Sequence, residues 1–262
     1  LAKWGLADGG VALANPLSAE LGVMRTRLLP GLVASLARNA ARQQSRVRLF
    51  EIGRTFGMGG DAPVETIRIA AVVCGDAAAE QWGEASRKVD FHDLKGDLES
   101  LAAAAGATLA FRPSAEPFGH PGRSTEVYRT DLEAGEVHLG WIGQLHPRLA
   151  RALDLDVEVV AFELDLEALE HRALPRATEL SRYPAVRRDL AFVVGLDVAW
   201  SDLAAGVRRA AGPVRRDLLL VDRYQGPGIE SGCKSLAMGL ILQDNTRTLT
   251  DHDADAVVER VV

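Results

Sequence analysis

The stretch that divides this chain is Ser181-Arg-Tyr-Pro-Ala-Val-Arg-Arg-Asp-Leu-Ala-Phe-Val-Val194. A basic lead-in stiffened by proline runs directly into residues that alternate along an apolar strand. The residues before this stretch indicate one large body of strands and helices, and those after it indicate one small domain. We therefore expect two domains, at residues 1–175 and 176–262.

Size and composition are those of a globular chain. The 262 residues are enough to bury a core, and no apolar run reaches the roughly 18 residues that a membrane span needs. Cys74 and Cys233 lie far apart without a CxxC pattern, and the six histidines lack metal-ligand spacing. We expect a cytoplasmic protein with no metal site and no membrane partner.

The net charge of −6 is unevenly distributed along the chain. Residues 1–175 carry the whole negative balance, while residues 176–262 are neutral and hold arginines in pairs at Arg187-Arg188, Arg208-Arg209 and Arg215-Arg216. Paired arginines can bind phosphate, but a neutral domain lacks the basic footprint of an autonomous nucleic-acid binder. If RNA is the ligand, we expect residues 176–262 to need additional RNA contacts from elsewhere in the protein or its assembly.

Residues 1–175 show more strands than helices. The pattern predicts helices from Pro30 to about Gln44, from an N-cap at Asp90 to Gly106, and over Pro147–Leu153. It predicts strands over Arg46–Ile52 (closed by Gly53), Thr66–Cys74, Thr108–Phe111, about 125–130, Val137–Gly143 and Val157–Leu164. Tight turns join several strands, so we expect a mostly antiparallel sheet with helices packed on it, an α+β fold.

The first body shows no catalytic constellation. It has no P-loop, no GxGxxG fingerprint and no GxSxG elbow. The residues Asp90 to Asp93 indicate a capped helix start rather than an active site. The segment His120-Pro-Gly-Arg-Ser124 could hold a phosphate through its backbone and Arg123, but a turn between strands is the favoured interpretation. We expect no catalytic residues.

The second part follows the order β-α-β-β-α. Its pattern predicts a strand over Arg188–Val194, a helix that Ser201 caps and Gly212-Pro213 ends, strands over Val214–Tyr224 and Cys233–Gln243, and a helix that a capping box at Thr250 opens. This order is that of a ferredoxin-like α/β sandwich that lacks its last strand.

The strand Cys233–Gln243 separates large from small residues. Leu236, Met238, Leu240 and Leu242 share one face, and the smaller residues from Cys233 to Gly239 share the other. Helices cover the first face in a ferredoxin-like fold and leave the second open. A face of small residues lets bases approach closely, as on RNA-binding sheets. A merely solvated face explains the pattern equally well.

Nine motifs of the chain carry a family resemblance. Those of the second part are Ser181 to Ala191, Asp222-Arg-Tyr-Gln-Gly226, Lys234-Ser-Leu-Ala237 and Arg247-Thr-Leu-Thr-Asp251. Those of the first part are Leu13-Ala-Asn-Pro-Leu-Ser18, Met24-Arg-Thr-Arg-Leu-Leu-Pro-Gly-Leu32, Val47-Arg-Leu-Phe-Glu-Ile-Gly-Arg54, His120 to Ser124 and Gly143-Gln-Leu-His-Pro147. Taken in the order in which they occur along the chain, these motifs resemble the beta subunit of bacterial phenylalanyl-tRNA synthetase, with its class II synthetase-like core and its ferredoxin-fold anticodon-binding domain.

The resemblance covers essentially the whole chain and implies a C-terminal fragment of that subunit. The enzyme of this family activates phenylalanine with ATP and Mg and then esterifies tRNA(Phe). Its chemistry takes place in the alpha subunit, within an assembly of two alpha and two beta chains. The resemblance therefore implies that residues 1–175 scaffold the alpha subunit, that residues 176–262 bind the anticodon, and that neither ATP nor Mg binds this fragment.

The resemblance also implies particular RNA contacts. An anticodon base stacks near an Asp-x-Tyr motif in this family, here Asp222 and Tyr224, with Ser235 nearby. A tyrosine ring is a stacking platform, and the polar side chains can bond to base edges. Arg182, Arg187 and Arg188 are candidate phosphate contacts; a packing role for Tyr224 and a solvated face for the arginines are the alternatives.

Two features agree with the resemblance to a core that has lost class II chemistry, and one departs from the family pattern. Class II catalysis uses a strand arginine and glutamate, but Arg48 and Glu51 have shifted spacing, and no glycine-rich motif occurs between Gly143 and Gly195. The family's last strand has no counterpart before Val262, which would leave the strand Arg188–Val194 as an edge. Two other functions stay open, a ferredoxin-like module that senses a small molecule without binding tRNA, and an independent enzyme.

Overall fold

The computed structural model describes residues 2–6, 10–18, 22–60, 62–132, 135–171 and 180–262. The chain divides into two compact units, Leu1–Leu174 and Pro175–Val262. The predicted domain boundary between residues 175 and 176 lies outside the described residues. In the described part of the chain, no helix is both long and apolar enough to cross a membrane.

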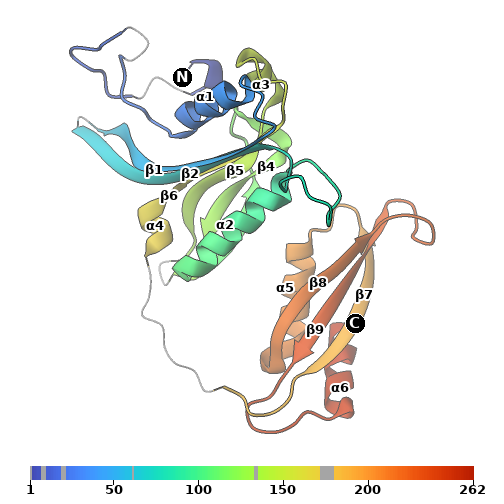
Figure 1. The fold of residues 1–262 in the computed structure, drawn as a ribbon. Helices are drawn as coiled ribbons and strands as arrows, with labels where there is room; N and C mark the ends of the chain where they lie inside the picture. The colour runs from blue at the N-terminus through green and yellow to red at the C-terminus, as the bar shows by residue number, and fades with distance from the viewer. Residues whose placement is uncertain (1, 7–9, 19–21, 61, 133–134, 172–179) are drawn as a thin grey trace. The chain divides into compact units, whose positions relative to one another are not determined.

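The first unit is built on a six-stranded sheet with the order β1-β2-β6-β5-β4-β3 (Figure 1). Its strands are β1 (Arg46–Gly59), β2 (Ala62–Gly75), β3 (Leu109–Pro113), β4 (Gly119–Arg129), β5 (Val137–Leu145) and β6 (Val159–Asp165). All neighbouring strands pair in antiparallel fashion. The predicted antiparallel α+β fold is therefore confirmed.

Helices cover both faces of this sheet (Figure 1). The 3₁₀ helix η1 (Ala2–Trp4) and the helices α1 (Leu29–Ala40) and α3 (Pro147–Ala152) contribute to one buried cluster, which includes Trp141. The helices α2 (Phe91–Ala105) and α4 (Leu166–Glu170) contribute to a second cluster against the other face. The sheet therefore separates two apolar cores, and its central strands are buried on both sides.

Local capping signals in the sequence predicted α2 correctly. The Asp90 side chain accepts hydrogen bonds from the backbone amides of His92 and Asp93 at the start of α2. Gly106 adopts a left-handed conformation (φ 72°) at its end, where a side chain would be strained. Both predicted ends of this helix are confirmed.

Several predicted ends in the first unit are wrong; β2, for example, begins at Ala62 rather than Thr66. The helix α1 stops at Ala40 rather than near Gln44, because Gln43 adopts a positive φ of 63° in the turn that follows. The strand β1 continues through Gly53, where a strand end was predicted, as far as Gly59. Gly53 leaves room for Arg25 instead: an added Cβ would lie 2.4 Å from its Nη2.

The buried carboxylate of Glu163 joins β6 to the start of α1. Its Oε2 accepts hydrogen bonds from the backbone amides of Leu28 (2.9 Å) and Leu29 (3.0 Å). These amides lie at the first turn of α1, where the N-cap residue Leu28 forms no side-chain cap. The carboxylate also lies 3.8 Å from the Arg68 guanidinium. A strand residue thus supplies the cap that the helix sequence lacks.

The second unit is a three-stranded antiparallel sheet with the order β7-β9-β8 (Figure 1). Its elements are β7 (Val186–Gly195), α5 (Trp200–Ala211), the 3₁₀ turn η3 (Gly212–Val214), β8 (Arg215–Tyr224), β9 (Cys233–Leu242) and α6 (Asp251–Val261). Both helices pack on one face, over Leu236, Met238, Leu240 and Leu242. The predicted β-α-β-β-α order and the large-residue face of β9 are confirmed.

The helix starts of the second unit show one success and one error. Thr250 and Asp253 form the predicted capping box at the start of α6. Ser201 does not cap α5, which begins at Trp200 with Ala199 at its N-cap position, two residues earlier than predicted. The Ser201 hydroxyl bonds instead to the neighbouring Asp202 carboxylate. The strand β7 lies at one edge of the described sheet, as predicted.

Replacing Glu163 by alanine should destabilise the first unit. The change leaves the buried amides of Leu28 and Leu29 without their acceptor, and we expect a loss of about 1–3 kcal/mol in the free energy of unfolding. Urea denaturation followed by tryptophan fluorescence measures this loss. Glu158→Ala is the matched control, because that carboxylate is exposed and should change stability by less than about 0.5 kcal/mol. Equal effects of the two changes would contradict the capping role.

The carboxyl group of Glu163 should also make the stability of the first unit decrease as the pH rises. Burial raises the pKa of Glu163 above its ordinary value, so the folded chain holds a proton that the unfolded chain has already released. Relative to Glu163→Gln, which does not titrate, the wild-type chain should lose stability as the pH rises from about 4 through the raised pKa. A stability difference that stays constant over this range would contradict the raised pKa.

Candidate nucleic-acid interface

The open face of the second sheet brings three predicted residues together. In the register of β8 and β9, Tyr224 lies opposite Ser235 and Asp222 lies opposite Ala237. Ser235 and Ala237 alternate with the buried Leu236 and therefore point away from the helices. Asp222, Tyr224 and Ser235 thus share one end of the face that α5 and α6 leave uncovered.

A β-bulge in β8 turns Asp222 and Tyr224 to this face. Leu218 lies opposite Leu240 and Leu220 opposite Met238, so both belong to the helix-covered face. The register then shifts between Leu220 and Asp222, which makes Val221 an extra residue. In a regular strand Asp222 would share the face of Leu218 and Leu220, because side chains alternate with a period of two.

Tyr224 lies at the end of β8 next to the hairpin loop 225–232. Its Oη donates a hydrogen bond to the Pro227 carbonyl (3.1 Å), and 44% of the residue is exposed. A Cβ at Gly226 would lie 2.8 Å from the Tyr224 Oη, so the glycine leaves room for this side chain. The loop therefore fixes the tyrosine while leaving much of it open to a ligand.

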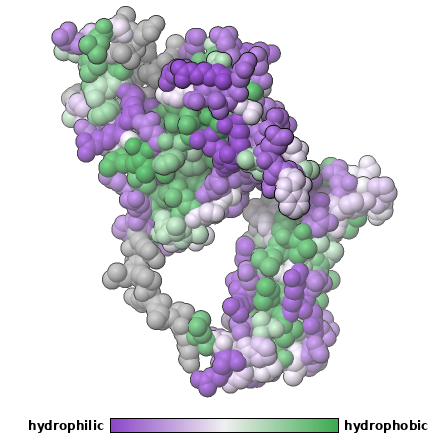
Figure 2. Space-filling model, viewed as in Figure 1, coloured by the Kyte–Doolittle hydropathy of each residue, from purple (hydrophilic) through white to green (hydrophobic). Residues whose placement is uncertain are grey.

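Apolar residues are exposed around these polar groups. Val193, Leu219 and Val221 each expose more than two fifths of their surface. Figure 2 shows apolar surface along β8 in the second unit. Val193 lies opposite Ser235 on β9, and Leu219 lies opposite Gly239. The face thus offers apolar contact beside hydrogen-bonding groups, which is a combination that suits unstacked bases.

The three candidate phosphate ligands lie at the other end of the sheet. Arg187 lies opposite Ile241 on β9, six residues from Ser235, which is about 20 Å along a strand. Its Nε forms an ion pair with Asp189 (2.8 Å), and the guanidinium lies over Gly239 on the open face. Arg182 is exposed in the lead-in to β7. The predicted base contacts and phosphate contacts therefore do not form one compact site.

Arg188 belongs to the helix-covered side of the sheet. Its guanidinium binds Asp251 (2.7 Å) and Asp255 (3.0 Å), both on α6. The hydrogen bond to Asp251, followed by that to Asp255, raises the pKa of the guanidinium. Arg188 therefore joins α6 to β7, and its charge is already matched by two carboxylates.

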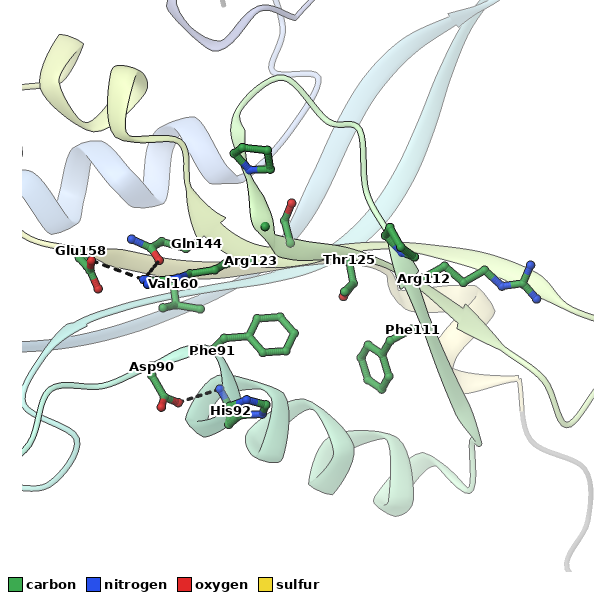
Figure 3. Close-up of a pocket in the computed structure, with 14 residues that line it drawn as sticks. Asp90, Phe91, His92, Phe111, Arg112, Arg123, Thr125, Gln144, Glu158 and Val160 are labelled. Carbon is green, nitrogen blue, oxygen red and sulfur yellow. Dashed lines mark hydrogen bonds and ion pairs between the residues drawn. The ribbon is translucent and has the colours of Figure 1, made fainter. Parts of the chain in front are cut away.

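A cleft of about 750 Å³ lies in the first unit (Figure 3). Residues from α2, β3, β4, β5 and the start of β6 line it, and the side chains of Phe91 and Phe111 project into it. Arg123 donates to the Gln144 Oε1 (2.9 Å) and lies 3.6 Å from Glu158. The sequence did not indicate this cleft, because its walls come from segments that are far apart in the chain.

The segment His120–Ser124 is not the turn between strands that its sequence suggested. It lies within β4 as an irregularity: Gly119 lies opposite Leu145, and the next paired residue, Ser124, lies opposite Gly143. The Ser124 hydroxyl donates to the His120 carbonyl across this bulge. Because Arg123 is bound by residues of the protein itself, the structure gives the phosphate interpretation no support.

Arg48 and Glu51, the arginine and glutamate that would correspond to a class II catalytic pair, do not point toward a common site. Arg48 on β1 binds Asp97 of α2, and Glu51 binds Arg25. Each is occupied by its own partner on a different side of the strand. Across the described ranges, no three His, Cys, Asp or Glu side chains gather in a way that could hold a metal ion.

Two family models match the chain. Residues 3–166 match the model described as the phenylalanyl tRNA synthetase beta chain CLM domain, and residues 181–262 match the ferredoxin-fold anticodon binding domain. The matched ranges fall one in each compact unit.

Curated relatives agree along the full length of the chain. It is 65% identical to a phenylalanine–tRNA ligase beta subunit of Xanthomonas campestris pv. campestris and 62% identical to one of Xylella fastidiosa. In both comparisons the match covers 100% of this chain and 33% of the relative. The chain thus spans about a third of the length of these relatives.

Substituting alanine for Gly226 should move the Tyr224 ring while leaving the fold intact. The added Cβ would displace the far end of this side chain, and φ at residue 226 is not among the positive values that strain alanine. The chain has three tyrosines, so the ring resonances can be assigned by NMR. We expect the Tyr224 resonances to shift. Gly206→Ala, in open space on α5, is the control that should leave them unchanged.

Proposed function

We infer the function of this chain from one premise: it belongs to the phenylalanyl-tRNA synthetase beta chain family. We propose that it is part of a phenylalanine–tRNA ligase beta subunit, that its first unit scaffolds the alpha subunit, and that its second unit binds the anticodon of tRNA(Phe). The whole enzyme would work in the cytoplasm as two alpha and two beta chains. ATP and Mg would be used in the alpha subunit.

The open face of the second sheet is the observation that carries the anticodon proposal. Residues 181–262 match the anticodon-binding model, and the register sets Asp222, Tyr224 and Ser235 beside one another on the uncovered face. A small-molecule sensing module is not favoured, because residues 181–262 of this unit match an anticodon-binding domain.

The proposed chemistry follows from the three side chains. The Tyr224 ring would stack on a base, an interaction worth about 1–3 kcal/mol per base. The Asp222 carboxylate would accept hydrogen bonds from base N–H groups, and the Ser235 hydroxyl would donate or accept one. Ala237 beside them has no large side chain to keep a base away from the sheet, whereas Gly239 lies under the Arg187 guanidinium. These three side chains would bind one base of the RNA, while the adjacent bases of the RNA remain in solvent.

The first unit suits a scaffold better than an active site. Arg48 and Glu51 are held in separate ion pairs, so neither is free to bind a nucleotide in the way that class II catalysis requires. The edge strand β1 also exposes Phe50 (73%) and Ile52 (54%). Exposed apolar side chains on an edge strand form a surface that another protein chain can cover. We propose that the alpha subunit covers it.

Tyr224→Ala should weaken binding of an anticodon stem-loop RNA without unfolding the second unit. Loss of one stacked base predicts a decrease of about fivefold to a hundredfold in affinity. Tyr224→Phe keeps the ring and loses only the hydrogen bond to Pro227, so it should bind nearly as well as the wild type. Fluorescence anisotropy with a labelled stem-loop measures both. Unchanged affinity of the alanine variant would exclude a stacking role for Tyr224.

Replacing Phe50 and Ile52 together by serine should reduce recovery of the alpha subunit in co-purification. Both changes remove apolar surface that the proposed interface would bury, at about 25 cal/mol per Å². Leu17→Ser is the control, because Leu17 is 97% exposed but lies outside β1. If the two variants retain the alpha subunit equally, β1 does not form this interface.

A further inference from the structure

Six arginines gather at the end of the second unit that lies opposite Tyr224 along β8. The helix α5 ends at Ala211 and β8 begins at Arg215, so the two arginine pairs of this region flank the short turn η3 (Figure 1). We call this surface the basic end; its members are Arg182, Arg208, Arg209, Arg215, Arg216 and Arg260.

Hydrogen bonds tie these distant segments to one another. The Arg260 Nε of α6 donates to the Ala210 carbonyl (3.4 Å) in the last turn of α5. The Gln243 side chain accepts from Arg216 (2.9 Å) and donates to the Tyr183 carbonyl (2.5 Å), next to Arg182. Residues from the lead-in, α5, β8 and α6 therefore converge, although they span most of the unit's sequence.

Charge pairing distinguishes the basic end from three other arginines of the unit, although Arg223, next to Tyr224, likewise has no salt bridge among the described residues and bonds to Gln225. Arg187, Arg188 and Arg247 each bind one or two aspartates. None of the six members of the basic end forms a salt bridge with a carboxylate in the described residues. Nearby acids have other partners: Asp217 accepts from the Leu218 amide and Asp244 accepts from Thr246.

Helix electrostatics account for only part of this arrangement. Arg208 and Arg209 lie in the last turn of α5, and Arg260 lies in the last turn of α6, where the helix dipole favours positive charge. Arg182, Arg215 and Arg216 are not in helices. The Arg215 Nε is buried without a hydrogen-bond partner among the described residues. Like charges held close together repel one another, and a bound anion would relieve this repulsion.

We propose that the basic end binds backbone phosphates of the same RNA whose base contacts Tyr224. This inference rests on the proposed anticodon binding. Guanidinium groups bind phosphate through parallel hydrogen bonds, and such contacts position an RNA without reading its sequence. Nine residue steps along β8 separate Arg215 from Tyr224, which corresponds to about 30 Å. One nucleotide cannot span this distance, so the ligand is an RNA stem-loop with its loop at Tyr224 and its stem toward the basic end.

The test measures how binding depends on salt. The 262-residue chain is titrated with an anticodon stem-loop RNA and with the same stem carrying a scrambled loop, at several salt concentrations. The variants are Arg208→Gln/Arg209→Gln, Arg215→Gln/Arg216→Gln and Tyr224→Ala. Arg148→Gln/Arg151→Gln, on exposed positions of α3, is the control that removes the same charge elsewhere. Thermal unfolding checks that each variant is folded, and the first variant avoids the partly buried Arg215.

We expect each basic-end variant to lower affinity several-fold for both RNAs and to reduce the slope of log affinity against log salt by about 1–2. Tyr224→Ala should lower affinity for the intact loop and keep the slope. The α3 control should change neither quantity.

Three outcomes would overturn the assignment. Unchanged slopes in both basic-end variants, with Tyr224→Ala still weakened, would reject the basic end and leave anticodon binding in place. A wild-type chain that binds neither RNA would reject both proposals. Variants that keep their RNA slope but lose binding to vesicles of phosphatidylglycerol and phosphatidylcholine would assign the surface to lipid instead.

Discussion

The contact on which the first unit depends is the bond between a central strand and a helix start. Glu163 lies on β6, between β2 and β5, and its carboxylate receives the two amides that open α1. The next strand accommodates it: Gly140 on β5 adopts a φ of 150°, and a Cβ there would lie 2.1 Å from the Glu163 carbonyl oxygen. One side chain therefore fixes the direction of α1 relative to the sheet, and a glycine on the neighbouring strand makes its position possible.

The second unit divides its polar residues between two purposes. On the covered side, Arg188, Asp251 and Asp255 hold α6 against β7. On the uncovered side, Asp222 and Ser235 form no comparable bond within the described residues, and Tyr224 is held by its own loop. Polar groups that are exposed on a rigid sheet and not used by the fold remain available for a ligand. This division supports a binding role for the open face more directly than its composition does.

Sequence patterns predicted the features that depend on residues close in the chain, and they missed the contacts between residues that are far apart in the chain. The caps at Asp90, Gly106 and Thr250 depend on residues within one turn, and the structure has all three. The Arg25 side chain that lies against Gly53 comes from outside β1, and the partners of Arg188 are more than sixty residues away. The candidate residues Asp222, Tyr224 and Ser235 were named from a resemblance, yet the bulge that aligns them has no sequence signature. The arginine pairs were visible in the sequence, but their convergence with Arg260 was not.

The bulge at Val221 makes the open face sensitive to residue number as well as residue type. Successive side chains of a strand point to opposite faces. In β8, Leu218 lies on the covered face and Asp222 on the open face only because Val221 is an extra, unpaired residue between them. If Val221 paired with Ala237, as in a strand without the bulge, every position beyond it would change sides. A carboxylate would then enter the apolar core and a tyrosine would leave the binding face, although no residue had been replaced by another. Deletion of Val221 would remove the bulge and keep both faces as they are, whereas deletion of a regularly paired residue of β8 would exchange them.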